Sequence, residues 1–303
     1  MRAKIPLMLD VDTGVDDAVA LALAVASPEI DLIGVSTLTG NVGVERTTEN
    51  TLQVLDWLGA GDVPVYRGAS RPLVRPIMDA VYFHGESGLG WGEFPATLRA
   101  VGQFKGPAAI VRMASQRPGE VTLVAVGPLT NVAIALNVEP NLPKMLKRLV
   151  IMGGAYRVPG NTKPWAEFNI LADPEAAAQV FAAPWNDCVA VGLDVSHQVE
   201  VTKDVWQKSR GLKGAGAQVL ARVAEQTFVE RPHYHFYLHD PLALAVGIDP
   251  SLVTCESGSI SVDVGQETPG KTTFTPGRGG VAIASAVDVE RFQQLFAERI
   301  GLS

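Results

Sequence analysis

Four aspartates lie within eight residues near the start of the chain, in the stretch LDVDTGVDDAVAL (9–21). Acidic residues in the first turn of a helix are favoured by the helix dipole and its free N–H groups, which explains Asp16 or Asp17. Those effects do not explain Asp10 and Asp12, because carboxylates this close raise one another's pKa unless a cation offsets their charge. A hard cation with oxygen ligands is therefore our first hypothesis, with helix caps and turns as the alternative.

The surrounding pattern indicates which elements position these carboxylates. Residues 5–9 form a short apolar run typical of a strand buried on both faces, and the helix that follows ends at Ser27-Pro28. Apolar runs and helix-forming segments then alternate, which predicts an α/β fold with a mostly parallel central sheet and helices on both faces, Rossmann-like in type. We expect further strands over 30–37, 63–66, 121–126, 148–152 and 188–193, and helices over 44–58, 107–115, 129–136 and 173–182. The later part is expected to be helical over 203–229 and 241–246, with a hairpin-like region over 259–283 and a last helix over 288–299.

Composition restricts the function classes. No repeat or linker divides the sequence, so we expect a single domain over residues 1–303. The net charge of −7 and the pI near 5.3 argue against binding to nucleic acid or to an anionic membrane surface. No apolar run is long enough to cross a bilayer or to form a signal peptide. Two cysteines without metal-type spacing, Cys188 and Cys255, fit a reduced, cytoplasmic setting.

Ligands of parallel α/β sheets bind outside the carboxyl ends of the strands, where Asp10 and Asp12 are expected to lie. Two known patterns compete for this motif. Phosphatase loops of the DxDGT type also place two aspartates after a first strand, but here Thr13 and Gly14 stand in the reverse order. The spacing DxDxGxDDA more closely resembles the signature of the nucleoside hydrolases, which cleave the N-glycosidic bond of ribonucleosides.

Other landmarks similar to those of this family recur in order along nearly the whole chain. Each is weak alone, and the resemblance rests on their order and spacing. They are TGN (39–41), HGESGLG (84–90), VGPLTNVA (126–133), IMGGAY (151–156), GN (160–161), AEFNILADPEAA (166–177), LDVSH (193–197) and HDPLA (239–243).

The resemblance implies one Ca²⁺ at the bottom of a pocket. Its expected ligands are three carboxylates and one backbone carbonyl: Asp12, Asp17, Asp240 and Val126. Oxygen donors of this kind suit calcium better than zinc. By the same resemblance, Asp12 would take a proton from a metal-bound water, and Asp16 would accept a hydrogen bond from the ribose 2′-hydroxyl. Asp10 would either support the loop from behind or contact the substrate.

Several residues match ribose-binding positions of the family. They are Asn41, Asn161, Glu167, Asn169 and Met152. Glu167 and Asn161 would bind the 5′-hydroxyl, Asn169 the diol side, and Met152 would cover the sugar. Phe168 would either lie near the ring or pack in the core. The alternative for the AEFN stretch is a loop cap before the helix at Asp173.

The reaction should pass through an oxocarbenium-like sugar, which carboxylates stabilise. His239 matches a histidine that the family places near the base, and it could protonate the leaving nucleobase. His84 is a second candidate there, with a structural role as its alternative.

The segment FVERPHYHFYLHD (228–240) departs from the family pattern. In the family this region is a mobile wall over the base, and some members carry Tyr and Gln where this chain has Arg231 and Thr227. Base preference therefore stays open, with Tyr234, His235 and Tyr237 as other possible contacts. Three histidines here could also suggest zinc, namely His233, His235 and His239, but Asp240 is needed for the calcium site.

The sequence therefore predicts a Ca²⁺-dependent ribonucleoside hydrolase that releases ribose and a free base. A non-catalytic nucleoside-binding protein on the same scaffold is one alternative, and a DxD phosphatase is another. The resemblance also implies a homodimer or homotetramer. Two Gly-rich stretches are interpreted as connections, GAGD (59–62) as a turn and KTTFTPGRGG (271–280) as a hairpin connection.

Overall fold

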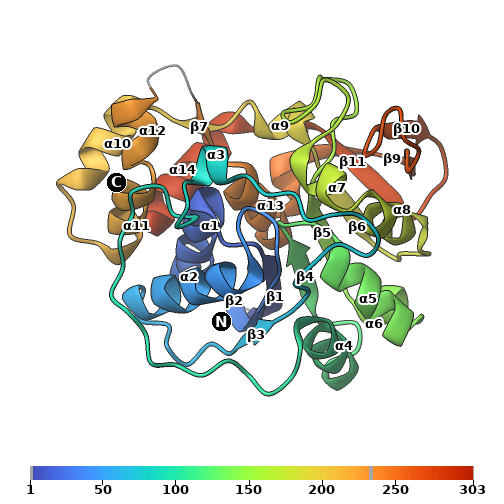
Figure 1. Ribbon diagram of the computed structural model, residues 1–303, viewed down its shortest axis with the longest axis horizontal. Coiled ribbons are helices and arrows are strands. Elements are labelled where there is room, and N and C mark those ends of the chain that lie inside the picture. Colours follow the sequence, from blue (N-terminus) through green and yellow to red (C-terminus); the bar gives the residue numbers. More distant parts are fainter. Residues whose placement is uncertain (1–2, 232–234, 303) are drawn as a thin grey trace.

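A nine-stranded, mostly parallel sheet forms the centre of the molecule, in a computed structural model that describes residues 3–231 and 235–302 (Figure 1). The strand order is β10-β9-β11-β6-β5-β4-β1-β2-β3, and a separate pair joins β7 to β8. All neighbours from β11 to β3 pair in parallel, whereas β9 is antiparallel to both β10 and β11. The strands are β1 (Ile5–Val11), β2 (Ile30–Thr37), β3 (Val65–Arg67), β4 (Thr122–Ala125), β5 (Arg148–Met152), β6 (Cys188–Val191), β7 (Glu200–Val201), β8 (Phe236–Tyr237), β9 (Val253–Val262), β10 (Thr272–Pro276) and β11 (Val281–Val287).

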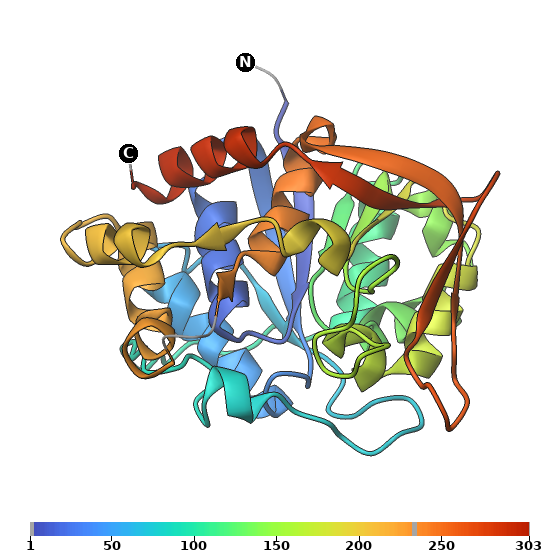
Figure 2. The same ribbon diagram turned by 90° about the horizontal axis from the view of Figure 1, so that it is seen from above.

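Helices cover both faces of this sheet, and Figures 1 and 2 show them on its two sides. They are α1 (Val15–Ala26), α2 (Val44–Trp57), α3 (Val81–His84), α4 (Gly106–Gln116), α5 (Thr130–Val138), α6 (Leu142–Met145), α7 (Phe168–Ala172), α8 (Pro174–Ala182), α9 (Leu193–Ser196), α10 (Lys203–Arg210), α11 (Ala215–Val223), α12 (Glu225–Glu230), α13 (His239–Ile248), the 3₁₀ helix η1 (Pro250–Leu252) and α14 (Val289–Ile300). No helix in the described part of the chain is both long and apolar enough to cross a membrane.

Each central strand contributes side chains to two separate hydrophobic cores. Leu7 and Leu9 of β1 pack into the core shared with α1, α11, α13 and α14, while Met8 packs into the core on the other face. The alternation follows from the two-residue period of a strand. It explains why these strands are apolar at consecutive positions, and it confirms the predicted fold class.

The chain changes direction across the sheet at β1. After β1 it continues to β2 and β3 on one side, and it then returns to β4, β5 and β6 on the other. The carboxyl ends of β1 and β4 therefore border the crevice where ligands of such sheets bind.

Three sequence predictions need correction. Strand β1 continues through Asp10 to Val11. Asp10 is fully buried and pairs with β2 on one side and β4 on the other. The helical stretch predicted over 203–229 is three helices, since Gly211 ends α10 and Gly214 begins α11. The stretch predicted to be a hairpin connection contains β10, whose Thr- and Phe-rich sequence pairs with β9.

Candidate active site

A cavity of about 300 Å³ lies where the predicted site residues converge. This volume is at the lower end of the range for small-molecule pockets. The predicted residues that line it are Asp16, Asn41, His84, Val126, Met152, Asn161, Glu167, Phe168, Asn169, His239 and Asp240. Most of these residues follow the ends of β1, β2, β4 and β5 or begin α13, so the cavity occupies the crevice expected from the strand order.

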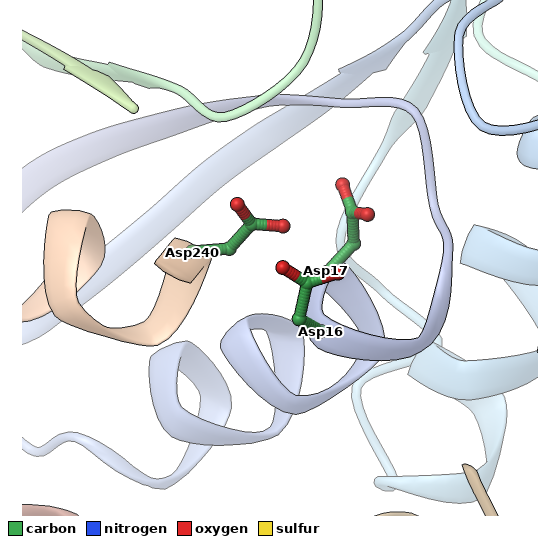
Figure 3. A group of neighbouring side chains, drawn as sticks. All are labelled: Asp16, Asp17 and Asp240. Carbon is green, nitrogen blue, oxygen red and sulfur yellow. The ribbon is translucent and has the colours of Figure 1, made fainter. Parts of the chain in front are cut away.

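Three carboxylates form a cluster on the cavity floor. One oxygen from each of Asp16, Asp17 and Asp240 lies within 4.8 Å of the others. Figure 3 shows Asp240 pointing from the start of α13 toward the two aspartates at the start of α1. Among residues 3–231 and 235–302, this is the only group of three or more His, Cys, Asp or Glu side chains with such spacing. The cluster could hold a metal ion.

Burial and mutual repulsion dominate the electrostatics of the cluster. Burial, followed by the charge of Asp17, raises the pKa of Asp16 to about 8. Burial raises the pKa of Asp17 to about 6, although the hydrogen bonds that it accepts from backbone N–H groups lower this pKa. Burial and the neighbouring aspartates also raise the pKa of Asp240 well above its ordinary value. Carboxylates held in this way need a cation to be ionised together.

Asp12 follows the end of β1, is 1% exposed and, unlike Asp16 and Asp240, is not among the cavity-lining residues. Its Oδ2 accepts a hydrogen bond from the Asn41 backbone N–H at 2.7 Å, whereas its Oδ1 is buried without a hydrogen-bond partner in the described part of the chain. Its backbone N–H donates to Asp17 Oδ1 at 3.1 Å. Asp12 and Asp17 are thus fixed to each other through the loop between β1 and α1.

Asp10 has a different environment from the other three aspartates of the motif. It lies inside β1, and its Oδ1 accepts hydrogen bonds from Ser36 Oγ at 2.5 Å and Asn131 Nδ2 at 2.7 Å. Burial raises its pKa to about 7. The cavity wall does not include Asp10. Of its two predicted roles, support from behind is the one that these contacts fit.

Asn169 connects two strand ends. Its Nδ2 donates to the Val126 carbonyl at 2.8 Å and to the Met152 carbonyl at 3.2 Å. Asn41 acts similarly on the opposite side, where its Nδ2 donates to Asp17 Oδ2 at 3.1 Å. Both amides therefore order the floor of the cavity while they form part of its wall.

Glu167 is the N-cap of α7. Its carboxylate accepts hydrogen bonds from three backbone N–H groups, those of Asn169, Gly154 and Ile170, at 2.9 to 3.2 Å. Asn161 Oδ1 accepts from the Phe168 N–H at 3.0 Å, which leaves the Asn161 NH₂ group to donate. The cap that sequence analysis gave as an alternative is therefore present, on a residue that also lines the cavity.

Phe168 packs in the protein interior, as one of its two predicted alternatives has it, and its position near a bound sugar stays a prediction. Its ring packs with Ala80 and Ala172 in a small hydrophobic cluster and also lines the cavity. The aromatic face is thus held rigidly beside the space available to a ligand.

Two histidines line the cavity with one ring nitrogen already bound. His239 Nδ1 lies 2.8 Å from Ser196 Oγ, and His84 Nδ1 accepts a hydrogen bond from the Val15 backbone N–H at 3.1 Å. Burial lowers the pKa of each ring to about 3, and His84 is additionally affected by the charge of Arg231. Both rings are therefore neutral near pH 7.

The segment expected to form the base wall is only partly described, since His233 and Tyr234 lie outside the described residues. His235 and Tyr237 line the cavity, and their rings stack with centroids 5.1 Å apart. His235 Nδ1 also pairs with Glu200 Oε2 at 2.5 Å. Arg231 donates to the Phe83 carbonyl at 2.8 Å and, like the buried Thr227, is not among the cavity-lining residues.

His197 is the main lining residue that sequence analysis did not assign. Its ring centroid lies 4.6 Å from that of Tyr237 and 5.5 Å from that of His239. The residue closes the LDVSH landmark, so its position in that motif was an available signal. Tyr82, Phe83 and Phe236 also line the cavity. Phe236 lies within the expected base-wall segment 228–240, whereas no motif marked Tyr82 and Phe83.

The family described as "Inosine-uridine preferring nucleoside hydrolase" matches residues 7–294. The chain belongs to this nucleoside hydrolase family. Nucleoside hydrolases are N-glycosyl hydrolases, so the predicted family, fold and enzyme class are confirmed.

Relatives of this nucleoside hydrolase match it over most of their length. "Non-specific ribonucleoside hydrolase RihC" from Salmonella agona is 40% identical over 98% of both chains. "Probable uridine nucleosidase 2" from Arabidopsis thaliana is 38% identical over 88% of this chain and 84% of the relative. The solved structure of a "Purine-Preferring Ribonucleoside Hydrolase from Gardnerella vaginalis" superposes with a TM-score of 0.91 at 33% identity, covering 97% of this chain and 98% of that one. Their names differ in the base, so membership of the family does not define base preference.

The described lining of the cavity does not offer the basic side chains with which a phosphatase would bind phosphate. Among the described residues that line the cavity, none is a lysine or an arginine. Phosphate recognition depends on such side chains or on backbone N–H groups aimed at the ligand. The N–H groups at the start of α1 are occupied by Asp17 and His84.

Proposed function

We propose that this nucleoside hydrolase cleaves ribonucleosides with water and uses a Ca²⁺ ion held by Asp17 and Asp240 of the carboxylate cluster together with Asp12, which lies outside that cluster. The observation that carries the metal proposal is Asp12 Oδ1, a buried carboxylate oxygen without a hydrogen-bond partner in the part of the chain that is described. Such an atom is costly unless a cation satisfies it. The proposed ligands are Asp12, Asp17, Asp240 and the backbone carbonyl of Val126.

The donor set supports calcium rather than zinc. All proposed ligand atoms are oxygens, and Ca²⁺ accepts six to eight oxygen ligands in flexible geometry. Neither His84 nor His239 belongs to the carboxylate cluster. When bound, the cation would keep these carboxylates ionised and acidify a water molecule.

Asp12 is proposed as the base that removes a proton from the attacking water. Its Oδ2 is held by the Asn41 N–H, so the partnerless Oδ1 is the oxygen available for other contacts. Asp16 faces the cavity from the same loop and would accept a hydrogen bond from the ribose 2′-hydroxyl. Together with Asp17, these carboxylates would stabilise the positive charge of an oxocarbenium-like sugar.

The remaining ribose contacts follow from the polar wall. The Asn161 NH₂ group and the Glu167 carboxylate would bind the 5′-hydroxyl, and Asn169 would bind the diol side. A carboxylate has about four acceptor positions, so Glu167 can take a hydroxyl in addition to its three N–H groups. Met152 and Phe168 would cover the apolar parts of the sugar.

The leaving base needs a proton or a hydrogen bond, because a nucleobase anion leaves poorly. His239 is proposed for this role, since it lines the cavity next to the proposed ligand Asp240 and its Nδ1 is held near Ser196. A neutral imidazole can donate a hydrogen bond through the nitrogen that carries its proton. Because its pKa is lowered, His239 would act as a neutral hydrogen-bond donor and not as a protonated imidazolium acid.

The test is the release of base and sugar in phosphate-free buffer. Inosine and 2′-deoxyinosine would be compared, with free base measured by chromatography and sugar by a reducing-sugar assay. We expect equal amounts of base and ribose from inosine and a rate lower by about 100-fold for the deoxy analogue, because that substrate leaves Asp16 unpaired. Cleavage that requires added phosphate, or equal rates for both compounds, would contradict the proposal.

A further inference from the structure

The first turn of α1, which carries Asp16 and Asp17, has no side chain of its own at the N-cap. Gly14 occupies that position. Helix N-termini leave free N–H groups that a Ser, Thr, Asp or Asn side chain usually accepts. Here the Val15 N–H donates instead to His84 Nδ1 at 3.1 Å, from a residue 69 positions away in the sequence. An imidazole on α3 therefore caps α1.

Gly14 gives the ring room to approach. A Cβ atom at this position would lie 2.4 Å from His84 Nδ1 and 2.7 Å from Asn41 Nδ2, both far too close. The backbone there is extended, with φ −102° and ψ −156°, and other residues can adopt that conformation. The glycine is therefore required by the contact with the two side chains rather than by backbone strain.

The contact fixes the tautomer of His84. A backbone N–H can only donate, so Nδ1 must be the unprotonated nitrogen, and a neutral ring then carries its hydrogen on Nε2. The ring is 6% exposed, and burial lowers its pKa to about 3. The hydrogen bond that the described residues make with this ring is at Nδ1, and the ring lines the cavity, so the Nε2–H can donate to a ligand there. His239 differs, because the Ser196 hydroxyl can either donate or accept.

We infer that His84 is a positioning residue for the aspartate-bearing turn of α1 and, through Nε2–H, a hydrogen-bond donor whose tautomer is fixed by the Val15 N–H. This inference rests on the proposed function in taking the ligand to be a ribonucleoside and the cation at the aspartates to be Ca²⁺. It assigns two separate tasks to the two nitrogens of one ring. Those tasks can be separated by substitution.

The variants His84→Asn and His84→Gln each replace the hydrogen-bonding function of one ring nitrogen and remove that of the other. The amide of Asn reaches about the position of Nδ1, so its oxygen can accept the Val15 N–H, but it has no group at Nε2. The amide of Gln reaches about the position of Nε2, so it can donate into the cavity but leaves the Val15 N–H without its acceptor. We expect His84→Asn to keep Ca²⁺ affinity within about twofold and to lose about tenfold or more in kcat, the cost of one hydrogen bond. We expect His84→Gln to keep more of kcat at saturating Ca²⁺ and to weaken Ca²⁺ binding by about tenfold.

The direct readout is the ¹⁵N spectrum of histidine-labelled wild-type protein, with the His84 signals assigned by their absence in His84→Asn. We expect an unprotonated Nδ1 and a protonated Nε2 near pH 7, with a scalar coupling across the hydrogen bond from the Val15 amide. A protonated Nδ1 would overturn the inference, and so would equal losses of Ca²⁺ affinity in the two variants.

These outcomes are distinct from a failure of the proposed function. If wild-type protein released no ribose but showed the expected ¹⁵N pattern, the inference about His84 would stand and ribonucleoside hydrolysis would fall. If ribose were released but Nδ1 carried the proton, ribonucleoside hydrolysis would stand and the inference about His84 would fall.

Discussion

The Asn41 backbone N–H donates to Asp12 Oδ2 at 2.7 Å, whereas Asp12 Oδ1, like Asp10 Oδ2, is buried without a hydrogen-bond partner in the described residues. The loop after β2 thus orients a carboxylate at the end of β1. Asn41 also donates to Asp17 from its side chain at 3.1 Å. One residue on a neighbouring loop therefore positions two of the proposed metal ligands.

Replacing Asp12 with Asn is expected to abolish most activity. The amide keeps an acceptor for the Asn41 N–H but puts a neutral group where the partnerless oxygen lies. We expect kcat to fall on the order of 1000-fold, equivalent to about 4 kcal/mol, and Ca²⁺ binding to weaken in calorimetry. The matched control is Asp10→Asn, another buried aspartate of the same motif, whose Oδ1 already accepts hydrogen bonds from Ser36 and Asn131 and which should keep kcat within about tenfold. Equal losses in the two variants would contradict the assignment.

Asp10 should make the stability of the fold depend on pH. Burial raises the pKa of Asp10 from 3.8 to about 7, so its carboxyl group stays protonated in the folded protein over a range where it ionises in the unfolded chain. The folded protein is therefore most stable, with respect to this group, below about pH 4, and it loses that stability as the pH rises through 7. Asp10→Asn should therefore become more stable relative to wild type between pH 4 and 7.5, by up to about 4 kcal/mol. Urea unfolding at both pH values, with Ca²⁺ at a fixed saturating concentration, measures the difference. The control Asp62→Asn removes an exposed carboxylate and should change stability by less than about 0.5 kcal/mol at either pH.

Calcium affinity should increase with pH. The pKa values of Asp16 and Asp17, raised to about 8 and about 6, mean that protons compete with a cation for these oxygens. Binding should therefore release protons, and affinity should rise between pH 6 and 8 by up to about tenfold per pH unit for each proton displaced. Calorimetry in two buffers of different ionisation enthalpy measures the number of protons released. An affinity that stays constant over this range would refute the competition.

Ser196 should act through His239. Its hydroxyl is fully buried and lies 2.8 Å from Nδ1 of His239, which lines the cavity. We expect Ser196→Ala to lower kcat about tenfold with little change in KM, because the ring loses the contact that fixes its orientation. In a double-mutant cycle, Ser196→Ala should add little to the loss caused by His239→Ala. Additive losses would show that Ser196 acts independently.

Ser209→Ala is the matched control for that cycle. Ser209 is also fully buried, and its Oγ donates one hydrogen bond, to the Trp206 carbonyl at 2.6 Å in α10. It lies outside the cavity wall. Its substitution is expected to lower stability by about 1 kcal/mol and to leave kcat and KM unchanged.

The sequence predicted the main elements where local pattern and tertiary environment agree. Strands β2 (30–37) and β5 (148–152) have the bounds that the sequence predicted. In β5 the continuous apolar run reflects a strand with a core on each face. Asp10 was predicted to lie past the strand because a carboxylate is unusual inside one. Only the tertiary contacts with Ser36 and Asn131 make its burial there possible.

The site was predictable where a motif gathers several ligands and unpredictable where one contact joins distant segments. The crowding of four aspartates, two of which helix capping did not explain, indicated a cation site, and the structure brings Asp16 and Asp17 together with Asp240. Nothing local to His84 indicates that its ring caps a helix 69 residues earlier, because the pairing depends on how α3 packs over α1. The contribution of His197 to the wall likewise depends on rings from separate segments meeting in space.

The most direct test of the central claim is ribose release from inosine, adenosine, guanosine, uridine and cytidine, each measured before and after calcium is removed with a chelator. We predict that at least one nucleoside releases ribose, that chelation stops this release, and that added Ca²⁺ restores it. The five rates would also define the base preference that Arg231 and Thr227 leave open. No release from any of the five by calcium-loaded protein, or release that survives chelation unchanged, would contradict a Ca²⁺-dependent ribonucleoside hydrolase.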